Sequence, residues 1–332
     1  MFHMDPSLSE TMEPSQSPQT AAVIAPQAGN LPWWNDRRLL GFAGSCLLLT
    51  LAFFGPLQAL VRYTLKEELH SHVLLIPVVS LYLAWQAIGT LPTERKTSLV
   101  GGVILIALAL GVFLLPQLLE NSMSANDDHS RWAACYALLI AAGGFLFLGN
   151  PLMRALAFPF AFMVFMIPLP NAGVVELESW LMRWSAEVSH WFFMLSGTPV
   201  FRDGQVMELP GTTLEVAPEC SGIRSTFVLF ITSLLASYML LKSPLHRGLL
   251  VAAVIPLGIL RNGLRVLVIG LLCVHEGPHM IDSWIHHKGG ALFFGISLVP
   301  LLVMVWWFQR RETRNLRITR QVDPEAGNQN ES

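Results

Sequence analysis

The chain has 332 residues, of which 53% are hydrophobic and only 13% are charged, and its formal net charge is −2. Soluble domains carry about 25% charged residues, so this composition argues against a soluble globular protein and predicts a polytopic membrane protein in a lipid bilayer. A net charge near zero also argues against nucleic acid as a partner. The four cysteines have no paired spacing, so we expect neither a disulfide framework nor a metal site, and we expect no cofactor.

The two ends of the chain differ from its centre. Residues 1–32 are rich in Ser, Pro, Gln and Thr and contain no basic segment followed by an apolar run, which predicts a disordered tail rather than a signal peptide. We therefore divide the chain into a disordered cytoplasmic tail (1–36), a transmembrane domain (37–310) and a cytoplasmic tail that is first basic and then polar (311–332).

Eight segments are apolar enough to be spanning helices, which need about 20 such residues. The fourth and fifth are separated only by Gly149-Asn150-Pro151, where we expect a tight helical turn. The fold class predicted is therefore an all-α polytopic membrane protein with about eight transmembrane helices. The segments are roughly 39–61, 73–90, 98–119, 132–149, 152–168, 219–242, 247–274 and 289–309.

Basic residues outside these segments are distributed unevenly. If the N-terminus is cytoplasmic, twelve Lys and Arg residues lie on the cytoplasmic side and six on the outer side. Because cytoplasmic loops carry the excess of positive charge, we expect both termini in the cytoplasm. The twelve are Arg37, Arg38, Arg95, Lys96, Arg154, Lys242, Arg247, Arg310, Arg311, Arg314, Arg317 and Arg320, and the six are Arg62, Lys66, Arg131, Arg183, Arg202 and Lys288.

The longest outer loop, residues 169–218, has two parts. Residues 174–195 repeat apolar side chains every three or four positions, including Leu181, Trp184 and Trp191, which predicts an amphipathic helix with tryptophans at the membrane interface. The second part predicts a small β-hairpin with arms at Val206–Leu209 and Thr213–Val216, because turn residues flank both arms.

Cys220 directly follows this hairpin and begins the sixth apolar segment. A thiol at a helix N-terminus is close to the positive end of the helix dipole, which favours the thiolate. Glu219 precedes it, and Arg224 lies one turn deeper on the same face of the expected helix. Taken alone, Cys220 is equally compatible with a small apolar residue at a helix start.

The seventh segment carries three polar residues in its outer half: Arg261, Asn262 and Arg265. A charge at the centre of a spanning helix costs about 2.5–3.5 kcal/mol, so such residues normally face a protein interior or a wet cavity and indicate a functional site. The structural alternative is an arginine bonded to backbone carbonyls or to a carboxylate such as Glu215 or Glu219.

His286 and His287 lie in the outer loop just before the eighth segment. Taken alone, His286 is compatible with an interfacial histidine that has no catalytic role. Together with Cys220 and the arginines, however, it completes a chemically coherent set at the outer face. A cysteine thiolate attacks a carbonyl, a histidine exchanges protons, and an arginine stabilises the thiolate or oxyanion, which suits acyl transfer.

These residues resemble the exosortase/archaeosortase family, over about residues 60–309. The resemblance is carried by the segments Val216-Ala217-Pro218-Glu219-Cys220-Ser221-Gly222-Ile223-Arg224-Ser225, Asn262-Gly263-Leu264-Arg265, His286-His287-Lys288-Gly289-Gly290, His70-Ser71-His72 with the Leu75-Ile76-Pro77 after it, and Ile167-Pro168-Leu169-Pro170.

The resemblance implies a multi-pass cysteine peptidase and transpeptidase of the bacterial inner membrane, with its active site facing the periplasm. Its substrates would be exported proteins with a C-terminal sorting signal, made of a Pro-containing motif, one membrane helix and a basic tail. The enzyme would cut at the motif and transfer the protein to an acceptor, often alongside exopolysaccharide production. Cys220 would be the nucleophile, Arg265 the catalytic cation and His286 the proton donor and acceptor. By position alone, Arg261 is an alternative to Arg265 as the catalytic cation, and His287 is an alternative to His286 as the proton donor and acceptor.

Two other functions remain open at this point. The protein could be a transporter or channel component of a polysaccharide or protein export system, with Arg261 and Arg265 lining a path for an anionic substrate. It could also be a non-catalytic scaffold of an export complex. Of the three functions, only that of a cysteine peptidase and transpeptidase gives the thiol of Cys220 a chemical role.

Overall fold

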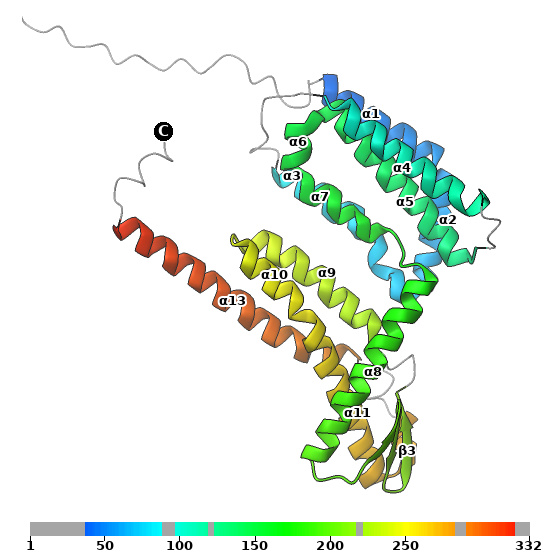
Figure 1. Cartoon of the computed structure of the whole chain (residues 1–332), viewed down its shortest axis with the longest axis vertical. Coiled ribbons are helices and arrows are strands. Elements are labelled where there is room, and N and C mark those ends of the chain that lie inside the picture. Colours follow the sequence, from blue (N-terminus) through cyan, green and yellow to red (C-terminus); the bar gives the residue numbers. More distant parts are fainter. Residues whose placement is uncertain (1–36, 88–96, 119–122, 217–221, 283–289, 323–332) are drawn as a thin grey trace, which may run out of the picture.

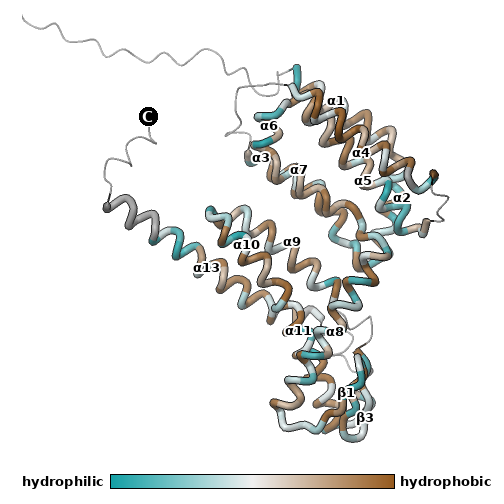
Figure 2. Tube along the Cα trace, viewed as in Figure 1, coloured by the Kyte–Doolittle hydropathy of each residue, from teal (hydrophilic) through white to brown (hydrophobic). Residues whose placement is uncertain are grey.

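The computed structural model describes residues 37–87, 97–118, 123–216, 222–282 and 290–322 (Figure 1). It is 84% helical. In this part of the chain six helices are long and apolar enough to cross a membrane, or up to eight if each of two bent helix pairs is one span. The predicted class, an all-α polytopic membrane protein, is confirmed. Apolar residues run along α1, α4 and α5 in Figure 2.

The first half of the chain forms a helical bundle in which α4 packs along α5 and α3 packs along α7 (Figure 1). Its elements are α1 (Arg37–Ala52), α2 (Phe54–Lys66), the 3-10 helix η2 (Glu68–Leu74), α3 (Ile76–Ala87), α4 (Leu99–Leu118), α5 (Ala125–Gly143), the π-helical segment η4 (Gly144–Leu148), α6 (Gly149–Ala155), α7 (Ala157–Phe162) and the 3-10 helix η5 (Met163–Met166).

Two pairs of successive helices meet at sharp bends. The helices α1 and α2 meet at 71°, so the first apolar segment is not one straight helix. Gly149, where a tight turn between two spans was predicted, is the first residue of α6 and has φ 83° and ψ 173°. The helical run Ala125–Ala155 nevertheless counts as one candidate span, so it continues past the predicted end of the fourth span. After residue 166 the chain turns by 89° into α8 (Asn171–Leu195).

The start of α8 is held against the start of α5 by side-chain hydrogen bonds. Asn126 donates from Nδ2 to the carbonyl of Leu169 and to Oδ1 of Asn171, both at 2.8 Å. Asp127 accepts from the backbone N–H of Asn171 at 2.8 Å. A carboxylate at a helix N-terminus is stabilising, so this network fixes the direction in which α8 leaves the bundle.

The predicted outer-loop helix and hairpin are both present, and the helix α8 covers the predicted range 174–195. The hairpin arms are β2 (Val206–Leu209) and β3 (Thr212–Glu215), with Met207 opposite Leu214. A further strand, β1 (Phe201–Asp203), pairs with β2 and completes an antiparallel sheet in the order β1-β2-β3. Strand β1 was not predicted, because three residues are too few to show an alternating pattern.

The helix α8 has a buried stripe and an exposed aromatic stripe. Leu181 is buried, whereas Trp184 is 47% and Trp191 is 62% exposed, as the expected position of these tryptophans at the membrane interface requires. The buried stripe also includes the small residues Ser185, Ala186 and Ser189, which were not predicted. Small side chains let two helices approach closely in a membrane, and α8 uses this stripe to pack along α11. Its tryptophans are left at the surface.

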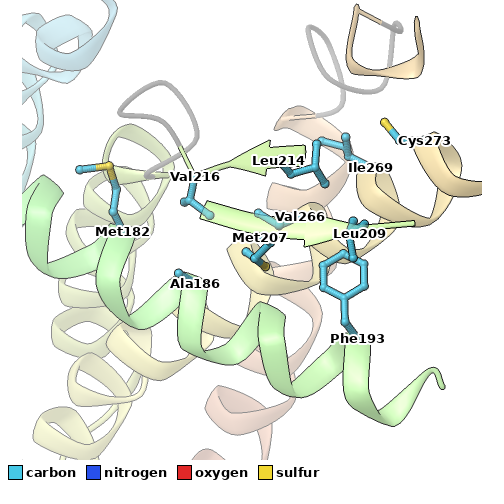
Figure 3. Packing of buried hydrophobic residues seen from close by; sticks show 10 residues of the cluster. All are labelled: Met182, Ala186, Phe193, Met207, Leu209, Leu214, Val216, Val266, Ile269 and Cys273. Carbon is cyan, nitrogen blue, oxygen red and sulfur yellow. The ribbon is translucent and has the colours of Figure 1, made fainter. Parts of the chain in front are cut away.

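The second half of the chain forms a smaller bundle, in which α11 and α13 both pack on α9. Ten buried residues of α8, the sheet and α11 form the hydrophobic cluster drawn in Figure 3. The elements of this half are α9 (Ile223–Leu240), α10 (Pro244–Ala252), α11 (Val254–Glu276), the 3-10 helix η7 (Pro278–Asp282) and α13 (Gly290–Val322).

Aromatic side chains join the two bundles. The rings of Phe158 in α7 and Tyr238 in α9 are stacked at 3.7 Å between centroids. Phe165 contacts Phe227 at 6.3 Å and Phe230 at 6.0 Å, both nearly edge-on. Since aromatic pairs add about 0.5–1.5 kcal/mol beyond the area they bury, α9 is bound to both halves of the protein.

We expect Gly270→Ala to destabilise the packing of α8 and the sheet on α11. A Cβ atom at Gly270 would overlap with Cζ of Phe193 and would lie 2.9 Å from Cδ1 of Leu214. Overpacking a core of this kind costs about 1–3 kcal/mol of unfolding free energy. The measurement is equilibrium unfolding of the purified protein in detergent.

The matched control is Gly248→Ala in α10, where nothing lies within 4 Å of the added atom. Alanine is a better helix former than glycine by up to about 1 kcal/mol, so this variant should be unchanged or slightly more stable. Equal stability of the two variants would contradict the close packing at Gly270.

Candidate active site

The first turn of α9 is the centre of the candidate site. Its N-cap is Gly222, which has φ 69° and ψ 13°, a left-handed conformation that side chains with a Cβ adopt only at a cost. No side chain caps the helix there. Gly222 therefore lets the chain turn sharply into the apolar helix, directly after the segment that contains Cys220.

Arg261 holds this turn from the neighbouring helix α11. Its Nη2 atom donates hydrogen bonds to the carbonyl oxygen of Gly222 at 3.1 Å and to Oγ1 of Thr226 at 3.0 Å. Arg261 is only 6% exposed. Arg261 is therefore bonded to a backbone carbonyl, which is the structural alternative considered from the sequence. This carbonyl belongs to Gly222, in the same segment as Cys220.

Gly222 also lies in direct contact with Asn262. A Cβ atom at position 222 would lie 2.9 Å from Nη2 of Arg261 and 3.2 Å from Oδ1 of Asn262. Both backbone conformation and space therefore require glycine at this position. The structure brings the end of the Cys220 segment against the Asn262-to-Arg265 segment, although the two are about 40 residues apart.

Arg265 lies one helical turn after Arg261 on α11 and is partly buried. The next residue, Val266, shares a hydrophobic cluster with Val216, at the end of the sheet (Figure 3). The chain is thus anchored to α11 at Val216, beside Val266, and again at Gly222, beside Arg261. Along α11, Arg265 lies between these two anchor points. Arg224, in contrast, is an exposed residue of α9.

Four of the predicted site residues, Glu219, Cys220, His286 and His287, lie outside the described residues. Their flanking helices are described, and they pack together: Leu229 of α9, Val254 of α11 and Leu301 of α13 share one buried cluster. The helices that follow Cys220 and His286 therefore form one bundle with the helix that carries Arg265.

His70 and His72 were not among the predicted site residues, although they belong to a segment that carries the family resemblance. Both are buried in η2, and the ring of His72 lies 5.0 Å from that of Phe227 in α9. Two histidines beside an apolar segment give no signal of such a contact, because only the tertiary structure places η2 against α9. Within the described residues no group of three His, Cys, Asp or Glu side chains could hold a metal.

We expect Gly222→Ala to disrupt the candidate site more than its backbone strain alone would. A left-handed alanine costs about 1–2 kcal/mol, and its Cβ would in addition displace the guanidinium of Arg261. The control is Gly204→Ala, which has a similar φ of 61° but nothing within 4 Å. The difference between the unfolding temperatures of the two variants measures the effect of the contact with Arg261. An equal decrease of the unfolding temperature in both variants would show that this contact does not contribute to stability.

Comparison with known proteins identifies the family of this chain. A family model described as transmembrane exosortase (Exosortase_EpsH) matches residues 64–303. No curated protein and no solved structure matches the chain. The matched range contains the Cys220 segment, the Asn262-to-Arg265 segment and His286, and it spans most of both helical bundles. The chain therefore belongs to the transmembrane exosortase family of membrane-embedded, protein-sorting cysteine transpeptidases, which act on exported proteins that carry sorting signals.

Proposed function

We propose that this protein cleaves a C-terminal sorting signal through the thiol of Cys220 and transfers the exported protein to an acceptor. The observation that carries the proposal is the contact of Gly222 with Arg261 and Asn262, at 3.1 Å for the hydrogen bond. It joins the two chemically distinctive segments of the chain, as a shared active site requires.

Cys220 is the nucleophile in this mechanism. It precedes Gly222 by two residues, so their Cα atoms are at most about 7.6 Å apart. The N-terminus of α9 favours a thiolate at this place, because the first backbone N–H groups of a helix are not bonded within it. The thiolate attacks the carbonyl carbon of the signal peptide and forms a tetrahedral intermediate.

Arg265 supplies the positive charge that this intermediate needs. Arg261 is committed to the carbonyl of Gly222 and to Thr226, whereas Arg265 lies between the two anchor points of the Cys220 segment. A guanidinium in a site of low dielectric stabilises an oxyanion much better than it would in water. Arg261 and Asn262 then act as supports that position the segment.

His286 transfers the protons of the first step. It takes the proton of the Cys220 thiol and gives it to the nitrogen of the departing C-terminal fragment, while the C–N bond breaks and a thioester remains. Attack of water or of an amine on the thioester then releases the product and regenerates the thiolate. The atoms balance without a metal or a redox cofactor.

The sheet and α8 would form the outer face of this site. Strand β3 ends at Glu215, and Val216 is buried against α11, so the sheet leads the chain directly into the Cys220 segment. We propose that the extended signal peptide lies beside this sheet, on the periplasmic side of the inner membrane, and that both termini are cytoplasmic. Exposed apolar side chains along α13, such as Val299 and Val303, suit contact with lipid or with the membrane helix of the substrate.

The first test is a co-expressed exported protein with a C-terminal signal, followed by its size on a gel. We expect Cys220→Ala and Cys220→Ser to reduce processing by at least about 10³-fold, since both remove the nucleophile. Cys46→Ala, in the partly buried middle of α1, should process normally. Full processing by both Cys220 variants would contradict the mechanism. Loss of export in the Arg261 and Arg265 variants, with normal function of the Cys220 variants, would favour a transporter.

The second test locates the thiol. Single-cysteine variants are treated on intact cells with a thiol reagent that does not cross the membrane. We expect Cys220 to react at least about tenfold faster than Cys135 and Cys273, which are each 3% exposed, because reaction requires an accessible thiolate. Equal protection of all four cysteines would contradict a site at the outer face.

A further inference from the structure

His70 and His72 are buried polar groups whose hydrogen bonding is incomplete. They are 4% and 9% exposed. Within the described part of the chain, both ring nitrogens of His70 and the Nδ1 atom of His72 lack a hydrogen-bond partner. Each buried polar atom left without a partner costs about 1–3 kcal/mol. Three such atoms in one place call for a bound polar group.

A cavity beside these imidazoles provides room for one. Its volume is about 10 Å³, and it is lined by Leu69, His70, His72, Leu169, Ile223 and Phe227. This volume is close to the lower limit for a water molecule, which also needs two to four polar partners. The two imidazoles are the polar side chains of this lining, so a small polar guest would bond to them.

The cavity adjoins the first turns of α9 on the side of the helix that faces the first bundle. Ile223 and Phe227 form its wall, and the ring of His72 contacts Phe227. Arg261 and Asn262 reach the same helix start from α11. The start of α9, which follows Cys220, therefore lies between Arg261 and Asn262 on one side and the two imidazoles on the other.

Simple packing does not account for the pair. Aromatic or aliphatic side chains would fill the same volume without unbonded nitrogens. Among the described residues no third His, Cys, Asp or Glu joins the pair in a group that could hold a metal. A role in accepting and donating protons near the start of α9 would explain why two imidazoles are buried there.

We propose that His70 and His72 bind and deprotonate the acceptor, a water molecule or a primary amine, that resolves the thioester on Cys220. This inference rests on the proposed function, and it assigns the second half of the reaction to residues other than His286. The signal peptide would occupy the side of the sheet and α11, which leaves the side of η2 for the acceptor. A cavity of about 10 Å³ admits a water molecule or only the amino group of a larger acceptor.

The step balances as follows. An O–H or N–H bond of the acceptor breaks, and its proton passes to a ring nitrogen of the pair. The acceptor's oxygen or nitrogen forms a bond to the thioester carbonyl carbon while the C–S bond breaks. The sulfur leaves with the electron pair as the thiolate, and the imidazolium returns the proton to the sulfur or to solvent.

The test uses the full-length protein in liposomes with a synthetic signal peptide labelled on its N-terminal side. His70→Phe, His72→Phe and the double variant keep an aromatic ring in place, which preserves the contacts with Tyr63 and Phe227. We expect the covalent enzyme–peptide adduct to form within about twofold of the wild-type rate, and its release to slow by about 10²-fold or more. Added hydroxylamine, a strong nucleophile, should restore release.

Two variants serve as controls. Ser80→Ala removes another buried side-chain atom that has no hydrogen-bond partner among the described residues. His129→Phe removes an imidazole that contacts Tyr63, at 4.9 Å, without lining the cavity. Both should release the peptide at the wild-type rate. Runs with and without a primary amine, scored by the mass of the product, separate transfer from hydrolysis.

Release of the peptide at the wild-type rate in the double variant would overturn the inference. A variant that keeps the wild-type unfolding temperature but slows adduct formation and peptide release equally would also overturn it. If the phenylalanine variants do not fold, His70→Gln and His72→Gln replace them, and the same outcomes apply. Absence of any adduct in the wild type would overturn the Cys220 mechanism itself, and this inference with it.

Discussion

The arrangement of the candidate site depends on one buried interaction, the guanidinium of Arg261 against the start of α9. A charged side chain at membrane depth costs about 2.5–3.5 kcal/mol. Arg261 offsets part of that cost by donating to the carbonyl of Gly222 and to Thr226. Because the carbonyl belongs to the N-cap of α9, the same bond fixes where the helix begins. The preceding segment, which contains Cys220, is thereby fixed at one end to α11.

Close packing of small residues fixes the other end. Ser189 of α8 donates to the carbonyl of Gly263 at 3.4 Å, and a Cβ atom at Gly263 would lie 2.7 Å from Val188. Since α8 can approach α11 this closely, the sheet that follows α8 lies against the outer part of α11 and places Val216 beside Val266. The helix packing and the guanidinium together leave only residues 217–221 to connect the two anchors.

The sequence predicted those parts of the fold that depend on local pattern. Apolar runs located the spanning helices, and turn residues located the arms β2 and β3. The burial of Ser185 and Ser189 in α8 was not predicted, because the periodicity rule assumes that apolar side chains are buried and polar ones exposed. At a membrane interface Trp184 and Trp191 can remain at the surface, while Ser185 and Ser189 supply the close contact with α11.

The candidate site was only partly accessible to sequence reasoning, for a related reason. Arg261 and Arg265 are conspicuous in any apolar segment, because their burial is costly wherever they lie. The sequence does not say that Arg261 bonds to Gly222, which requires knowing how α9 and α11 pack. The involvement of His70 was harder still to foresee, since a histidine beside a helix is inexpensive if it reaches water. The roles of Cys220, Arg265 and His286 stay predictions from sequence and resemblance.

The packing of α9 against both bundles gives the two halves of the protein separate roles at one helix start. From the second bundle, Arg261 and Arg265 supply fixed positive charge, which cannot be removed at physiological pH. From the first bundle, His70 and His72 supply imidazole groups, which can accept and donate protons. Acyl transfer needs both kinds of group, one to stabilise an oxyanion throughout and the other to change its charge as the acceptor attacks. The aromatic contacts of Phe165 with Phe227 and Phe230 keep the two bundles in register, so relative movement of the bundles would change the distance between the fixed charges and the proton carriers.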